Sequence, residues 1–164
     1  MTGLLLAILL TQTPAPAAAP PQKGHYTAIE LVRVDVKEGV EFPADYLITM
    51  TEELATQLTG TKKFTAVLRE GEKPAAEGTP TLLLVGTVTH FDKGSRAARY
   101  LVGFGAGQTK VAAHIKVLDR ATEAVLFEDD VDGKVVMGVA GGDSIGATRG
   151  LAKEVAKVVR NRFF

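Results

Sequence analysis

Residues 81–91, TLLLVGTVTHF, followed at residues 110–118 by KVAAHIKVL, decide the fold of this chain. Residues 82–85 are apolar at consecutive positions, which is typical of a strand buried on both faces in the middle of a sheet. In the second stretch every other residue from Val111 to Val117 is apolar, so one face of this strand is expected to be buried. Residues 119–124 predict a hairpin turn, after which residues 125–131 and 134–139 return as one strand, or as two broken at Asp132-Gly133.

The flanking segments add two strands and two helices. Residues 25–36 and 63–69 alternate apolar and polar side chains and predict strands, while residues 70–80 predict an exposed loop. A helix is expected between these strands, from Phe42-Pro43 to its C′ residue Gly60. A last helix is expected from about Ser144, and its Gly146 and Gly150 would let it lie close to the sheet. The apolar faces of the two helices are Leu47, Met50, Leu54 and Leu58, and Ile145, Leu151, Val155, Val158 and Val159.

The order strand, helix, strands, helix predicts an α+β fold with a mostly antiparallel sheet of about five strands and both helices packed on one face. With 164 residues, 46% of them hydrophobic, the chain is long enough for one domain and a leader. We assign residues 1–19 to a signal peptide, residues 20–24 to a linker and residues 25–164 to the single α+β domain.

The assignment of a signal peptide rests on the first residues of the chain. Residues 4–10, LLLAILL, are too short to span a bilayer and are followed by small residues, with Ala17-x-Ala19 as a cleavage site, although no Lys or Arg precedes them. The chain has no cysteine, which excludes disulfides, Cys-ligated zinc and a lipoprotein anchor on cysteine. We therefore expect an exported protein in the periplasm or associated with the outer membrane.

Residues 94–110, GSRAARYLVGFGAGQTK, combine small and basic side chains and are the candidate contact surface. Glycines and alanines let a backbone approach a neighbouring strand, another subunit, a lipid or an anion closely. The spacing does not fit a phosphate-binding loop, because Lys110 leads into a strand instead of opening a helix. The candidate contact residues, including Lys93 just before this stretch, are Lys93, Arg96, Arg99, Tyr100, Gly103, Gly105, Gly107 and Lys110.

Residues 86–126 resemble an uncharacterised family of exported bacterial proteins, the domain-of-unknown-function family 4410. The resemblance rests on Gly86-x-Val88 at the end of a strand, on Gly94-Ser95 with Arg99, on Gly103-x-Gly105-x-Gly107 and on Asp119-x-x-Thr122 at the hairpin. The chain departs from the family at Glu123, where such hairpins often carry glycine. The family implies a domain located in the cell envelope, often similar to lipoproteins, with no established activity.

The charges of the chain limit its partners. The formal net charge is +0, which argues against a dedicated nucleic-acid binder. The charges are nevertheless separated: residues 92–110 hold four basic side chains and one acidic, and residues 119–133 hold six acidic and one basic. Such opposed patches favour head-to-tail association, or attraction of an anionic membrane surface to the basic patch. The carboxylates of residues 128–132 lack the spacing of a calcium loop, and we expect neither a metal nor a cofactor.

No nucleophile, base and orienting group share a recognisable motif, so we expect a non-enzymatic domain that works by binding a protein partner or by self-association in the cell envelope. Two alternatives remain open. In the first, the chain is a membrane-inserting, pore-type oligomeric subunit in which residues 100–113 pair with neighbouring copies. In the second, it is a small periplasmic ligand-binding protein or hydrolase, which would need a closed pocket with converging polar groups.

Overall fold

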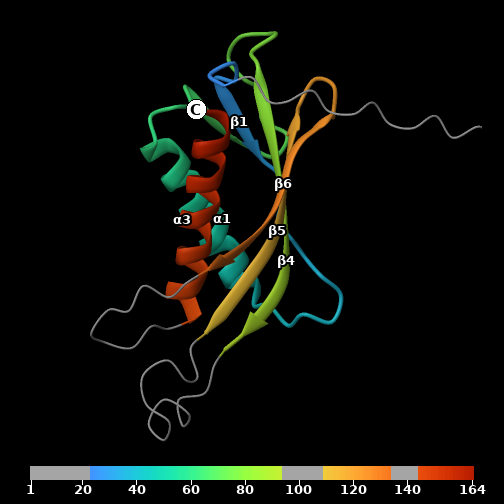
Figure 1. Ribbon diagram of the computed structural model, residues 1–164, viewed down its shortest axis with the longest axis vertical. Coiled ribbons are helices and arrows are strands. Elements are labelled where there is room, and N and C mark those ends of the chain that lie inside the picture. The colour runs from blue at the N-terminus through green and yellow to red at the C-terminus, as the bar shows by residue number, and fades with distance from the viewer. Residues whose placement is uncertain (1–22, 94–108, 134–143) are drawn as a thin grey trace, which may run out of the picture.

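The computed structural model describes residues 23–93, 109–133 and 144–164, and these form one sheet with two long helices (Figure 1). Their order follows the sequence prediction of strand, helix, strands and helix. The elements are β1 (Ala28–Leu31), β2 (Asp35–Val36), α1 (Ala44–Gly60), β3 (Ala66–Arg69), β4 (Thr81–Asp92), β5 (Lys110–Asp119), β6 (Val125–Gly133) and α3 (Ser144–Phe163).

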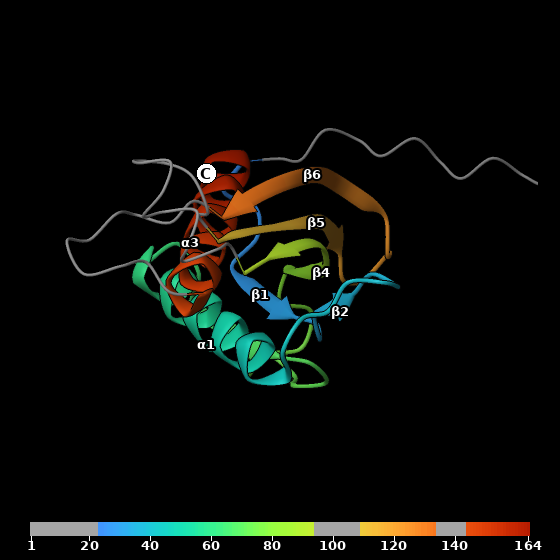
Figure 2. The same cartoon turned by 90° about the horizontal axis from the view of Figure 1, so that it is seen from below.

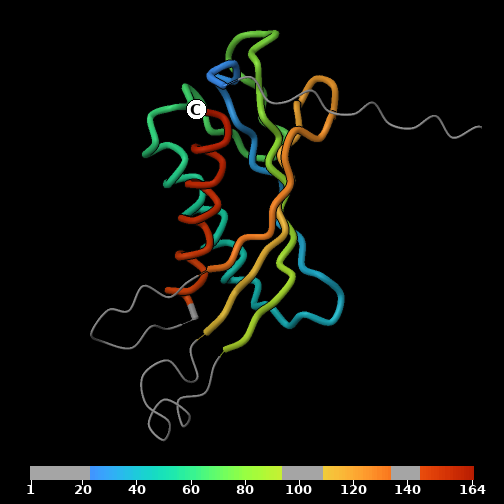
Figure 3. Tube along the Cα trace, viewed as in Figure 1, coloured from blue at the N-terminus to red at the C-terminus, as the bar shows by residue number. Residues whose placement is uncertain are grey.

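The sheet is mixed, so the prediction of a mostly antiparallel sheet is wrong. Its strands lie in the order β3-β1-β4-β5-β6, and β2 also pairs with β4. β4, β5 and β6 form an antiparallel meander, whereas β1 is parallel to both β3 and β4, and β2 is parallel to β4. The reason is the path of the chain: α1 crosses back between β1 and β3, and residues 70–80 return from the end of β3 to the start of β4 (Figure 3).

The predicted strand of residues 25–36 is divided into two short strands along one edge of β4. β1 pairs with residues 81–84 and β2 with Thr87 and Val88. Between them the chain leaves the ladder after Val32, whose N–H still donates to the carbonyl of Leu84 at 3.0 Å. The next N–H, that of Arg33, donates to a carboxylate oxygen of Glu70 at 3.1 Å. The side chain of Glu70, in the loop that follows β3, therefore supplies the hydrogen-bond acceptor where the ladder between β1 and β4 is interrupted.

Both helices lie to the same side of the sheet (Figure 2). Met50, Leu54 and Leu58 of α1 are buried, as their helical spacing predicts, and Leu47 packs against the same core. The buried face of α3 carries Ala147, Leu151, Ala152, Val155, Ala156, Val159 and Phe163. The sheet contributes the alternating face of β5 that the sequence predicts, Val111, Ala113, Ile115 and Val117.

The prediction that Gly60 is the C′ residue of α1 needs correction. Gly60 is the last residue of α1 instead of its C′ residue, and the left-handed backbone that follows falls on Lys62, with φ of 55°. A close approach between α3 and the sheet occurs at Gly133, where a Cβ would lie 2.7 Å from the carbonyl oxygen of Ala147 and 2.8 Å from Leu151 Cβ. Gly146 and Gly150 of α3 are half-buried. Gly133 of β6 is therefore a small residue that the close packing of α3 on the sheet requires.

Candidate functional site

Lys93 and Lys110 are the two predicted contact residues that the structure describes, and both lie at one end of the sheet. Lys110 pairs with Asp92 across β4 and β5, and the hydroxyl of Thr109 donates to the carbonyl of Lys93 at 3.0 Å. Both lysine side chains are exposed. The other candidates, Arg96, Arg99, Tyr100, Gly103, Gly105 and Gly107, lie outside the described residues.

The ends of four elements meet here, and we call this region the basal end. β4 ends at Asp92, β5 begins at Lys110, and Val111 of β5 pairs with Gly133, the last residue of β6. α3 begins at Ser144, and its first turns contact Gly133. The connections 94–108 and 134–143 therefore start and finish at the same end of the domain. Chain segments far apart in sequence share one small region, which can act as a single contact surface.

Three aromatic rings close the core beside the basal end, a feature that sequence reasoning missed. Phe42 lies before α1, Tyr46 in its first turn and Phe91 near the end of β4. The ring centroids are 4.9 Å apart for Phe42 and Phe91 and 5.9 Å apart for each pair with Tyr46, all in edge-on orientation. The cluster joins the beginning of α1 to the strand that leads into Lys93, so this end of β4 is firmly held.

Carboxylates line the outer face of the sheet on β6. Glu128, Asp130 and Asp132 alternate with inward residues and are exposed on the face opposite the helices. Two basic residues of β5 meet them: His114 lies 2.9 Å from Asp130 and 3.4 Å from Glu128, and Lys116 lies 3.2 Å from Glu128. The described residues contain no group of three or more His, Cys, Asp or Glu arranged to hold a metal ion.

A buried ion pair joins two loops at the opposite end of the sheet, which we call the apical end. The side chain of Glu30, on β1, is 6% exposed, and its Oε2 lies 2.8 Å from Nε of Arg120. The N–H of Gly71 donates to its other oxygen at 2.8 Å, and Arg120 also donates to the carbonyl of Glu72 at 3.0 Å. The pair thus fastens the loop of residues 70–80 and the hairpin of residues 119–124 to the outer face of β1.

Tyr26 and Asp119 form a second polar contact at the apical end. The Tyr26 hydroxyl donates to Asp119 at 3.0 Å, while the other carboxylate oxygen accepts from the backbone of Ala121 and Thr122. Burial, together with the carboxylate, raises the pKa of Tyr26 to about 12. Burial acts to raise the pKa of Asp119, but the hydrogen bonds from Thr122, Tyr26 and Ala121 outweigh it and lower that pKa. Both groups hold the hairpin, which adopts the predicted turn with Glu123 at φ of 56°.

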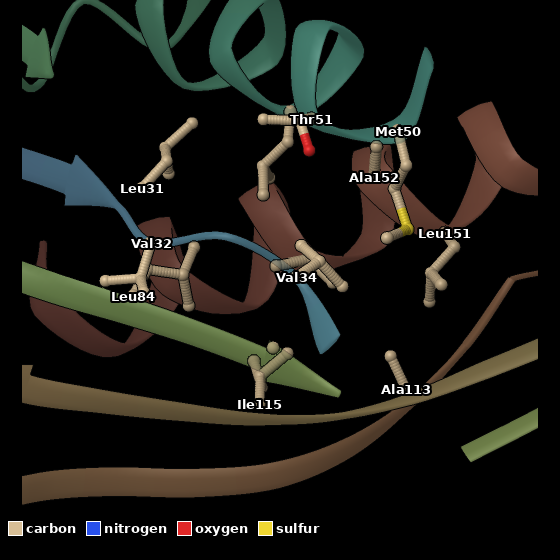
Figure 4. A pocket seen from close by; sticks show the side chains of 13 residues that line it. Leu31, Val32, Val34, Met50, Thr51, Leu84, Ala113, Ile115, Leu151 and Ala152 are labelled. Atoms are coloured by element: carbon tan, nitrogen blue, oxygen red, sulfur yellow. The ribbon is translucent and has the colours of Figure 1, made fainter. Parts of the chain in front are cut away.

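Two hollows accompany these features. A crevice of about 940 Å³ at the apical end is lined by His25, residues 73–81 and residues 119–121. A smaller apolar cavity of about 30 Å³ lies between the helices and the sheet, as Figure 4 shows, with Met50, Leu84 and Ala113 in its wall. It has space for little more than a water molecule, and apolar cavities of this kind stay dry. We therefore attribute it to imperfect packing of the core.

Among the described residues, neither helix combines the length and the apolar character needed to cross a membrane. This finding concerns only helices.

The chain belongs to the family described as domain of unknown function (DUF4410), whose sequence model matches residues 41–161. The resemblance read from residues 86–126 is thereby confirmed. A search of curated proteins finds no match.

Several solved structures share the fold. One is the PelC dodecamer from Paraburkholderia phytofirmans, with a TM-score of 0.58 and 15% identity, where the alignment covers 90% of this chain and 96% of that chain. A hypothetical protein from Chlamydia trachomatis has a TM-score of 0.55 and 11% identity, with 84% and 98% covered. A Xanthomonas campestris protein of family DUF330 has a TM-score of 0.51 and 10% identity, with 86% and 87% covered. At these identities the likeness concerns the fold.

Proposed function

We infer that this chain is a non-enzymatic, exported domain of the cell envelope that acts by association with copies of itself. The observation that carries the proposal is the likeness to a subunit of a dodecamer, because the alignment takes in nearly the whole of both chains. A fold that assembles into a dodecamer in one protein has element ends and surfaces suited to repeated contacts. The location, in the periplasm or at the outer membrane, is supported by the apolar residues 4–10 and the small residues that follow them.

The proposed contact surface is the basal end. Lys93 and Lys110 flank a connection that contains Arg96 and Arg99, so four basic side chains belong to one short stretch of chain. Asp92, which pairs with Lys110 across the strands, is the one acidic residue between positions 92 and 110. A neighbouring copy, or an anionic membrane surface, would be attracted to such a stretch through its carboxylates or phosphates.

Light scattering on the purified chain, with and without anionic liposomes, tests this proposal. We expect a mass well above that of one chain, or transfer of the protein to the liposomes. The double variant Arg96→Glu/Arg99→Glu should lose either form of association and keep its melting temperature. A chain that stays monomeric at all concentrations would refute self-association, whether or not it binds liposomes. A double variant that unfolds would mean that these arginines have a structural role.

A further inference from the structure

Basic side chains form a stripe along the solvent-facing side of α3. Arg149, Lys153, Lys157 and Arg160 follow one another at intervals of four, four and three residues, and all are exposed. These intervals keep them on one side of a helix, opposite the apolar side that packs on the core. Lys157 pairs with Glu154 at 3.0 Å, whereas Arg149 and Lys153 form no ion pair within the part of the chain that the structure describes. We call these four residues the helix stripe.

The outer face of the sheet carries charges of the opposite sign. Glu128, Asp130 and Asp132 of β6 form what we call the strand row, and Asp132 has no ion pair among the described residues. His114 and Lys116 contact the other two, so the acidic character is greatest toward the basal end. Figure 2 shows the helices and the sheet as separate layers. The helix stripe is exposed on α3 and the strand row is exposed on the outer side of β6, so one copy carries the two surfaces on different elements.

The two rows also agree in spacing. Successive residues of the helix stripe four positions apart are separated by about 6 Å along the helix axis. Residues two positions apart in the strand row are separated by about 7 Å along the strand. Over three residues these distances differ by roughly 2 Å, which long lysine and arginine side chains readily accommodate. Charges can therefore be matched one to one when a helix lies along the strand.

We propose that the helix stripe of one copy docks on the strand row of the next, so that copies associate head to tail. This inference rests on the proposed self-association and adds a second contact to the one proposed at the basal end. Each copy presents one helix stripe and one strand row. However many copies associate in an open chain, a helix stripe therefore remains unoccupied at one end and a strand row at the other. Such a heterologous contact produces a closed ring or an open filament, according to the rotation between neighbours. The edges of the sheet are not used.

Charge reversal tests the proposal. One variant, Arg149→Glu/Lys153→Glu, lowers the formal charge of the helix stripe from +4 to 0 and places two glutamates where it would meet the strand row. Another, Asp130→Lys/Asp132→Lys, changes the formal charge of the strand row from −3 to +1 and places two lysines where it would meet the helix stripe. Each alone should associate about tenfold or more weakly than the wild-type chain in light scattering, because like charges then meet at the contact. Arg149 and Lys153 are chosen because they are exposed and because Arg160 and Arg162, in the last turn, favour the helix dipole and are left in place.

An equimolar mixture of the two variants gives the decisive result. The two glutamates in the stripe of the first then face the two lysines in the row of the second, and the unaltered surfaces also match, so the wild-type mass should return. The control Glu38→Lys/Glu77→Lys alters two exposed loop residues outside both surfaces and should associate normally. Circular dichroism melting establishes that each variant folds. If wild-type chains associate but the reversals have no effect, or the mixture stays dissociated, this contact is wrong and self-association stands. If wild-type chains stay monomeric, both proposals fail.

Discussion

Breaking the ion pair between Glu30 and Arg120 should destabilise the domain far more than breaking an equally short pair on the surface. In the substitution Arg120→Met the alkyl chain is nearly preserved while the charge is removed. The carboxylate of Glu30, whose side chain is 6% exposed, then keeps the N–H of Gly71 at 2.8 Å as its remaining partner. The surface pair Arg69–Glu52 has the same N–O distance, 2.8 Å, but its side chains are 51% and 56% exposed.

The magnitude follows from this difference in burial. Removing one partner of a buried pair costs about 3–5 kcal/mol, and we expect about 3 kcal/mol because Arg120 is itself 28% exposed and water can reach its place. For a domain of this size that corresponds to a fall of roughly 10 °C in melting temperature. Arg69→Met should leave the unfolding midpoint unchanged within error, because water solvates both charges of an exposed pair.

Urea unfolding followed by circular dichroism measures these effects. The double variant Glu30→Gln/Arg120→Met completes the comparison, since glutamine can still accept from Gly71 and carries no charge. It should recover most of the stability that Arg120→Met loses. The reasoning is refuted if Arg120→Met lowers the unfolding midpoint no more than Arg69→Met does, or if the double variant is as unstable as the single one.

Four further substitutions test the core and the apical end. Gly86→Ala should raise the free energy of unfolding by about 0.5–1 kcal/mol, because its Cβ would meet Val34 at 3.6 Å, an ordinary contact beside the apolar cavity. Gly133→Ala should lower it by about 1–3 kcal/mol, because its Cβ would lie 2.7 Å from the Ala147 carbonyl; equal effects of the two changes in urea unfolding would contradict this account. The pKa of Tyr26, raised to about 12, gives stability that is complete below pH 10 and is lost as the pH rises toward 12, so Tyr26→Phe should be less sensitive to alkali. The lowered pKa of Asp119 has its effect at low pH: the stability that it gives the domain is present above about pH 4 and is lost on acidification. Asp119→Asn should therefore flatten the acid limb of a curve of stability against pH.

The sequence predicts the local elements well because their signals are local. The apolar stripe from Leu47 to Leu58 and the alternation from Val111 to Val117 depend on helix and strand periodicity alone. Both appear in the structure with the expected faces buried. The turn at residues 119–124 is likewise set by side chains within it, since Asp119 accepts from the backbone of residues 121 and 122.

The parallel pairing of β1 could not be read in the same way. Four buried residues, Ala28 to Leu31, have the same pattern in a parallel or an antiparallel neighbourhood, and the direction depends on where α1 returns the chain. The candidate contact was predicted from composition alone. Lys93 and Lys110 meet at one end because β4 and β5 are paired, whereas the stripe on α3 and the row on β6 become surfaces of separate layers only after the fold is assembled.

The position of β1 between β3 and β4 has a consequence for the order of folding. β4, β5 and β6 pair with neighbours in sequence, so this part of the sheet can form without residues 23–80. β1 needs partners 38 residues away at Ala66 and 53 residues away at Thr81, and closing these loops is the larger entropic obstacle. The first strand of the domain is therefore expected to take its place late. A chain that emerges from its amino terminus would remain without the parallel pairs between β1 and β4 until residues 81–84 are available.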